Sequence, residues 1–250
     1  MMLVLLLLSA NSGWQFEPIL TNERVRNTST ETSTDDCKTL DPNGEVYKQA
    51  LMDRLEEHRK ERYAHLTEER FEAIRQLVVE YSDTFVIDGA PCGVVKGYEF
   101  DIELEPNARP VRHQLPKMSV REMEKEQYHI KKAEAMGHLR IPTDAQKSEW
   151  STRTHVVFKK DDEMGRWICD FRPLNAVTRK RPTPIGEVFA KTRLLAGRRW
   201  KSGLDAWCGF NQMRASERAS RLLQIITSKG VRQWTVLPFG VTNGPHTFRK

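Results

Sequence analysis

The sequence has few of the features that mark disulfide-rich secreted domains or zinc-binding modules. Its 250 residues include four cysteines, which lie far apart and form no Cys-x-x-Cys pair. This spacing argues against a disulfide scaffold and against a structural zinc site. We therefore expect reduced thiols at Cys37, Cys92, Cys169 and Cys208.

Long hydrophobic runs are also missing. The run Leu3–Leu8 is far shorter than the roughly 20 apolar residues of a membrane span. It is shorter than a usual signal-peptide core, and no basic residue precedes it. We expect an intracellular protein, cytoplasmic or nuclear, with no membrane association and no secretion through residues 1–13. In the alternative of an exported protein, Asn27 would be a glycosylation acceptor.

Acidic residues are scarce in the second part of the chain. Residues 1–150 carry 20 basic and 27 acidic side chains, whereas residues 151–250 carry 20 and 7, a net charge of +13. A basic region behind an acidic one is typical of a chain that faces a polyanion such as nucleic acid. The alternative is a solvated basic surface with no ligand.

Local patterns divide the chain into three parts. Residues 1–44 combine the apolar N-terminus with a polar lead-in that we expect to be disordered. Residues 45–118 read as a connector, helical over residues 45–81 with Thr67 as an N-cap, then extended, with a strand pattern over residues 99–105. The predicted packing face of the helical part comprises Phe71, Ile74, Val78 and Tyr81.

Residues 119–250 mix helices with strands. Ser119 opens a helix through a capping box, and Gly137 can end it. A hairpin is predicted from strands at residues 154–160 and 166–171 around a turn at 161–165, and a helix at residues 183–195. Further strands are expected at 201–206, 222–227 and 231–236, with a helix starting near residue 243. The order predicts an α+β fold.

Three short stretches could carry chemistry. Asp205 ends a strand, where a carboxylate can hold a divalent metal, although an aspartate there is commonly a turn former. Lys159, Lys160 and Arg166 on the hairpin could surround a triphosphate, or could be solvated. The aromatic and glycine residues of 232–248 could stack bases, or could form an ordinary strand and turn.

The joint order of four stretches resembles the reverse transcriptases of gypsy-like long-terminal-repeat retrotransposon Pol proteins. The stretches are KSEWSTRTHVVFKKD (147–161), GRWICDFRPLNAVT (165–178), KSGLDAWCGFNQM (201–213) and QWTVLPFGVTNGPHTF (233–248). The resemblance covers residues 109–250. It implies the fingers and first part of the palm of a right-hand polymerase, preceded by an N-terminal helical extension.

The resemblance also implies roles for individual residues. Asp205 matches the first catalytic aspartate and, with the carbonyl of Ala206, a ligand of Mg²⁺, with Mn²⁺ as an alternative. The remaining matches fall into two groups, nucleotide binding at Lys159, Arg166, Ala206, Phe210, Phe239 and Gly240, and template or primer binding at Arg172, Asn175 and Pro245.

The implied reaction is template-directed synthesis of DNA from deoxynucleoside triphosphates on an RNA or DNA template-primer. The family's Tyr-x-Asp-Asp hairpin, which supplies two more carboxylates, does not occur in these 250 residues. We therefore expect a fragment of a Pol protein that lacks the rest of the palm, the thumb and the RNase H segment and is inactive alone. The alternative is a non-catalytic nucleic-acid-binding module derived from a retroelement.

Overall fold

The computed structural model describes residues 3–8, 41–87, 93–159, 162–182, 190, 193–194, 196 and 201–248. Backbone contacts divide the chain into two compact units, Met1–Gly93 with Ile185–Trp207, and Val94–Pro184 with Cys208–Lys250. Both units contain helices and strands, so the predicted α+β class is confirmed.

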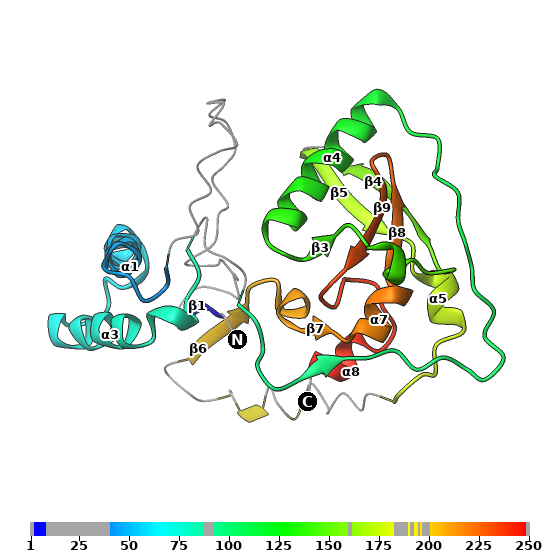
Figure 1. Ribbon diagram of the computed structural model, residues 1–250. Coiled ribbons are helices and arrows are strands. Elements are labelled where there is room, and N and C mark those ends of the chain that lie inside the picture. Colours follow the sequence, from blue (N-terminus) through cyan, green and yellow to red (C-terminus); the bar gives the residue numbers. More distant parts are fainter. Residues whose placement is uncertain are drawn as a thin grey trace. The chain divides into compact units, whose positions relative to one another are not determined.

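The first unit contains a helical hairpin instead of one long helix. Its helices are α1 (Glu45–Glu57), α2 (Arg59–Arg62) and α3 (Glu68–Glu80), followed by a 3₁₀ turn, η1 (Ser82–Thr84) (Figure 1). The helical character predicted over residues 45–81, with Thr67 as an N-cap, is confirmed for most of this range, and residues 63–67 between α2 and α3 are not helical. The chain folds back so that α1 and α3 bury apolar faces against each other, which a single straight helix could not do. The buried side chains of this cluster are Tyr47, Leu51, Met52, Leu55, Tyr63, Phe71, Val78 and Phe85.

The predicted packing face of α3 is partly right. Thr67 is the N-cap residue, Phe71 and Val78 are buried, and Ile74 packs against the cluster. Tyr81 is 50% exposed because it lies beyond the last helical turn, in a non-helical conformation. The helical periodicity therefore stops one residue before Tyr81.

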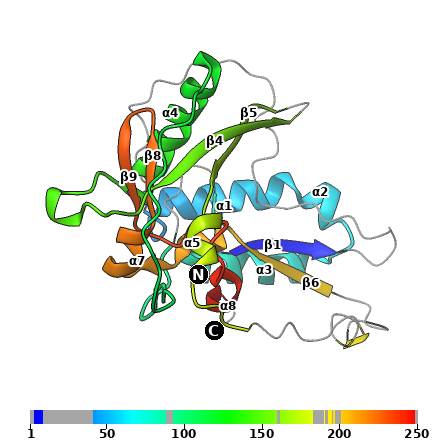
Figure 2. The same ribbon diagram turned by 90° about the vertical axis from the view of Figure 1, so that its right-hand side faces the viewer.

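The apolar run at the N-terminus is a strand. β1 (Leu3–Leu8) pairs antiparallel with β6 (Lys201–Ala206), in a register that joins Leu3 to Ala206 and Leu8 to Lys201. Figure 2 shows the two strands side by side. The sequence predicts β6 correctly, but nothing local indicates that a segment two hundred residues away would be its partner.

The second unit is built on a five-stranded sheet in the order β3-β9-β8-β4-β5. The strands are β3 (Leu139–Arg140), β4 (Thr152–Lys159), β5 (Asp162–Cys169), β8 (Gln224–Thr227) and β9 (Gly230–Trp234). Within this sheet the β4–β8 pairing is parallel and the other three pairings are antiparallel. Helix α4 (Val120–Ala135) lies against β4 and β5 (Figure 1).

Two predicted features of α4 are present. Its capping box forms between Ser119 and Glu122, and Gly137 follows the helix at φ 70°. The buried carboxylate of Glu126 accepts hydrogen bonds from the Thr154 hydroxyl and from the backbone N–H of Ser228. These bonds tie α4 to β4 and to the β8–β9 turn, which the sequence also predicts.

Three predicted element bounds are wrong. β5 starts at Asp162, so residues 162–165, which are predicted as turn, belong to the strand. Within β5, Gly165 has φ 67°, and a Cβ atom added there would lie 2.7 Å from Val156 Cγ1. The strand expected over 99–105 is only β2 (Glu99–Phe100), paired with β7 (Arg214–Ala215). The strand expected from residue 222 starts at 224, because Ser216 caps α7 (Glu217–Leu222).

Short helical elements complete the second unit. They are η2 (Asp144–Gln146), α5 (Arg172–Ala176), η3 (Gly209–Gln212) and α8 (Gly244–Phe248). The start of α8 agrees with the prediction. Most of the helix predicted at 183–195 and of the lead-in at 21–44 lies outside the described residues, although residues 190, 193 and 194 are helical.

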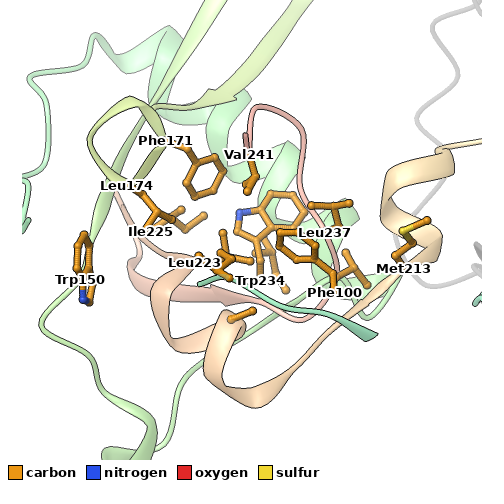
Figure 3. Packing of buried hydrophobic residues seen from close by; sticks show 14 residues of the cluster. Phe100, Trp150, Phe171, Leu174, Met213, Leu223, Ile225, Trp234, Leu237 and Val241 are labelled. Carbon is orange, nitrogen blue, oxygen red and sulfur yellow. The ribbon is translucent and has the colours of Figure 1, made fainter. Parts of the chain in front are cut away.

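One apolar core fixes the parts of the second unit that carry the candidate site. Trp234 from β9 stacks on Trp167 of β5 with ring centroids 5.8 Å apart. Phe171 and Leu174, at the start of α5, pack in the same cluster as Leu237 and Val241 (Figure 3). The core therefore holds α5 next to the segment that follows β9.

Among the described helices, none has the length and apolar content required to cross a membrane.

Candidate nucleotide and nucleic-acid site

The turn at residues 239–242 is fastened to helix α5 by one side chain. Asn175 donates from Nδ2 to the carbonyl oxygen of Gly240 at 2.7 Å and accepts at Oδ1 from the N–H of Thr242 at 2.9 Å. Gly240 has φ 92°, a conformation that disfavours any side chain. The sequence assigns Asn175 to a template contact, whereas its amide is engaged within the protein at both ends.

Three phenylalanines form a cluster beside this turn. The ring of Phe210, in η3, lies 5.2 Å from that of Phe239 and 5.5 Å from that of Phe248, centroid to centroid. Phe239 is 63% exposed, whereas Phe210 is half-buried. The structure thus brings two predicted nucleotide-binding residues together. Phe248 is a third member that the sequence did not single out, because its place at the end of α8 becomes visible only in the fold.

Pro245 lies exposed in the first turn of α8. The preceding Asn243 is buried, accepts at Oδ1 from the N–H of Arg181 at 3.1 Å and donates from Nδ2 to the carbonyl of Arg179 at 2.9 Å. These two bonds attach the start of α8 to the chain that follows α5. They thereby fix the backbone just before the exposed Pro245.

A buried carboxylate joins two arginines next to α5. Arg172 donates to Asp170 from Nε at 2.7 Å and from Nη2 at 2.9 Å, and Arg153 donates from Nε and Nη2 to Asp170 Oδ2, both at 3.2 Å. The hydrogen bonds from Arg172, with a smaller contribution from Arg153, hold the pKa of Asp170 far below its usual range against the effect of burial. Sequence analysis missed Asp170 and Arg153; the one available signal was an aspartate two residues before Arg172.

The two predicted phosphate-binding residues lie on the β4–β5 hairpin. Arg166 is exposed on β5, opposite Val157 of β4. Lys159 ends β4 opposite Asp162, and its side chain lies outside the described residues. Lys160 also lies outside them. The predicted hairpin is present, but β5 starts at Asp162 instead of residue 166, and the strand register shifts between Val157 and Lys159.

Asp205 and Ala206 belong to the first unit, at the end of β6. Asp205 is exposed and pairs with Val4, and Ala206 pairs with Leu3. Magnesium prefers near-octahedral oxygen coordination, usually with one or two protein carboxylates. Over the described ranges, no three His, Cys, Asp or Glu side chains gather as a metal site. One carboxylate and one carbonyl do not complete a two-metal centre, so we assign no chemical step to a metal.

Two cysteines lie near the site residues in sequence, and both are free thiols. Burial raises the pKa of Cys169 to about 12 and also raises the pKa of Cys208. Raised pKa values disfavour the thiolate, so neither residue has the character of a nucleophile. Cys37 and Cys92 lie outside the described residues.

Comparison with known proteins shows a distant similarity to the reverse-transcriptase regions of retroelement Pol polyproteins. The chain is 23% identical over 185 residues to the retrovirus-related Pol polyprotein from transposon 412 of Drosophila melanogaster, covering 71% of this chain and 14% of that protein. It is 34% identical over 83 residues to an RNA-directed DNA polymerase homolog of Oenothera berteroana, covering 33% and 58%. It is also 25% identical over 127 residues to a putative enzymatic polyprotein of Cassava vein mosaic virus, covering 49% and 19%.

The fold has a counterpart among solved structures. The foamy viral protease-reverse transcriptase, solved in complex with double-stranded DNA, matches 81% of this chain with a TM-score of 0.62 and 19% identity, over 33% of its own length. No family model matches the chain. The comparisons therefore show a distant similarity to the reverse-transcriptase regions of retroelement Pol polyproteins and a shared fold, and this chain spans only part of each of these relatives.

Proposed function

We propose that the chain forms the fingers and first part of the palm of a gypsy-like reverse transcriptase, and that it binds a template-primer and deoxynucleoside triphosphates. In this proposal residues 119–250 are the polymerase part, residues 45–118 the connector and residues 1–44 the N-terminal lead-in. The parent reaction is template-directed DNA synthesis, to which Asp205 and Ala206 would contribute ligands for Mg²⁺ or Mn²⁺.

The observation that carries the proposal is the attachment of the turn at residues 239–242 to α5 through Asn175, with Phe210 against Phe239. Asn175, Phe210 and Phe239 come from three different stretches of the resemblance, and these contacts bring them together in the second unit. Arg172 supplies exposed cationic surface at the start of the same helix. An exposed aromatic ring beside fixed backbone and a guanidinium suits a ligand that combines a base with phosphates.

A second candidate is a nucleic-acid-binding module without turnover. It is favoured by the net charge of +13 over residues 151–250, because contacts to phosphates require basic side chains and no catalytic carboxylates. Both candidates predict binding to phosphate backbones, and only the first predicts nucleotide binding that depends on a divalent metal.

The test is a binding titration with the full chain. A fluorescent DNA primer-template and an RNA–DNA hybrid would be titrated over 50–400 mM salt, with and without Mg²⁺ and a deoxynucleoside triphosphate. The logarithm of the association constant should fall linearly with the logarithm of salt concentration. A folded sample that does not bind at low salt, or binds equally at all salt concentrations, would contradict both candidates. If Mg²⁺ and a nucleotide together tighten the binding of primer-template, the result supports the first candidate over the second.

A further inference from the structure

Two arginines from different elements of the second unit share one carboxylate. Arg153 comes from β4, and Arg172 follows β5 at the start of α5. Asp170 between them is only 4% exposed at its side chain, whereas the side chains of Arg153 and Arg172 are 46% and 81% exposed. The carboxylate is thus buried beneath two guanidinium groups that face solvent.

The hydrogen bonds leave donors free on both arginines. Each guanidinium contacts Asp170 through Nε and Nη2, so that Nη1 of each carries two N–H groups with no partner in the part of the chain that the structure describes. The group of three carries a net charge of +1. A guanidinium presents its donors in a rigid planar fork that matches two oxygens of a phosphate.

Other arginines in the same unit are paired differently. Arg218 contacts Asp101 at two points, and Arg232 contacts Glu134, so each of these cations has its own carboxylate. Such pairs have no excess charge and offer little attraction to an anion. The cluster at Asp170 differs from these pairs because one anion contacts two cations. Glu217 also contacts two arginines, Arg140 and Arg221, but its side chain is 50% exposed, whereas that of Asp170 is buried.

We propose that Arg153 and Arg172, oriented by Asp170, form a clamp for a phosphodiester group of a nucleic-acid backbone. Arg172 carries a template assignment from sequence; the new elements are Arg153 as a second phosphate contact and Asp170 as the positioning residue. This inference rests on the proposed function in one respect, because the phosphate is that of the bound template-primer. Asp170 itself makes no contact with the nucleic acid.

The experiment compares salt dependence among variants of the full chain. Each phosphate contact contributes about 0.9 to the slope of log K against log salt concentration on duplex DNA. Arg153→Ala and Arg172→Ala should each make the slope shallower by about that amount, and the double variant by about twice as much. Arg153→Lys keeps the charge and should keep most of the slope. Arg218→Ala is the matched control and should leave the slope unchanged.

Asp170→Asn tests the positioning role separately. Removing this negative charge raises the net charge by one, so charge alone predicts tighter binding. If Asp170 positions the two arginines, its replacement should instead weaken nucleic-acid binding several-fold at low salt. This is the result we expect. Thermal melting of each variant shows whether it is folded, and Arg153→Gln replaces Arg153→Ala if the latter unfolds.

The outcomes separate the clamp from the proposed function. A wild-type chain that shows no salt-dependent binding overturns both. A wild-type chain that binds, with slopes unchanged in folded Arg153→Ala, overturns the clamp alone. Tighter binding by Asp170→Asn overturns its positioning role.

Discussion

Asn175 and Gly240 stand 65 residues apart in the sequence, and the amide of the first donates a hydrogen bond of 2.7 Å to the carbonyl of the second. With the bond accepted from Thr242, this contact holds the turn that carries the exposed ring of Phe239. A residue assigned from sequence to the template therefore also shapes the neighbouring nucleotide side of the candidate site.

Replacing Asn175 should destabilise the second unit. Asn175→Ala removes both hydrogen bonds and should lower the free energy of unfolding by about 1–3 kcal/mol, as measured by urea denaturation. Asn175→Asp retains the acceptor for Thr242 but places a carboxylate oxygen against the carbonyl oxygen of Gly240, so it should also destabilise the unit. Asn107→Ala is the control, because Asn107 is exposed. Equal stability of Asn175→Ala and Asn107→Ala would contradict the anchoring role.

The stability of the chain should depend on pH through Asp170. Its pKa in the folded protein is lowered, mainly by hydrogen bonds from Arg172. Ionised Asp170 therefore stabilises the fold above the usual aspartate pKa of about 4, and this contribution is lost as pH falls through the lower folded-state pKa. The difference in unfolding free energy between wild type and Asp170→Asn should be largest near neutral pH and shrink below pH about 4.

The matched control for this pH series is Glu149→Gln, which alters an exposed carboxylate. Its stability relative to wild type should change little over the same range. A difference for Asp170→Asn that stays constant from pH 7 to pH 2 would show that the ion pairs with Arg172 and Arg153 do not contribute as argued.

The chain as given should not extend a primer. With Mg²⁺, primer-template and deoxynucleoside triphosphates, we expect no incorporation above a blank, because Asp205 is the one carboxylate present of the three that the resemblance implies. A gel-based extension assay checks this. Incorporation that disappears in Asp205→Ala would show that the expectation is wrong and that these residues suffice.

Phe210 and Arg166 should have separable effects in a longer protein that supplies the Tyr-x-Asp-Asp carboxylates. Phe210→Ala should raise the use of ribonucleotides relative to deoxynucleotides, because removal of the ring opens space beside the sugar. Arg166→Ala should weaken both nucleotides alike, by about ten- to a hundred-fold for a lost charge-assisted contact of about 1.5–3 kcal/mol.

Steady-state kinetics with matched ribo- and deoxynucleoside triphosphates measures this contrast. Unchanged sugar discrimination in Phe210→Ala would show that the ring of Phe210 does not exclude the 2′-hydroxyl of ribonucleotides. A selective loss of deoxynucleotide use in Arg166→Ala would show that Arg166 reads the sugar as well as the phosphates.

Local features of this protein are encoded in short stretches of sequence. The capping box at Ser119, the helix stop at Gly137 and the hairpin turn at Ser228 each depend on residues within a few positions of one another. Such features could be predicted because their energetics involve only neighbouring backbone and side-chain groups. The order of motifs along the chain likewise indicates the resemblance to reverse transcriptases.

Tertiary structure decided the features that depend on distant partners. The packing of α3 against α1, the pairing of Leu3–Leu8 with β6 and the attachment of Asn175 to Gly240 all join segments whose sequences do not indicate each other. The arginine cluster is the clearest case, because Arg153 and Arg172 lie on different elements and only the fold places Asp170 between them. Chain sequence specifies which groups are available, but burial and packing of the whole unit determine which groups meet.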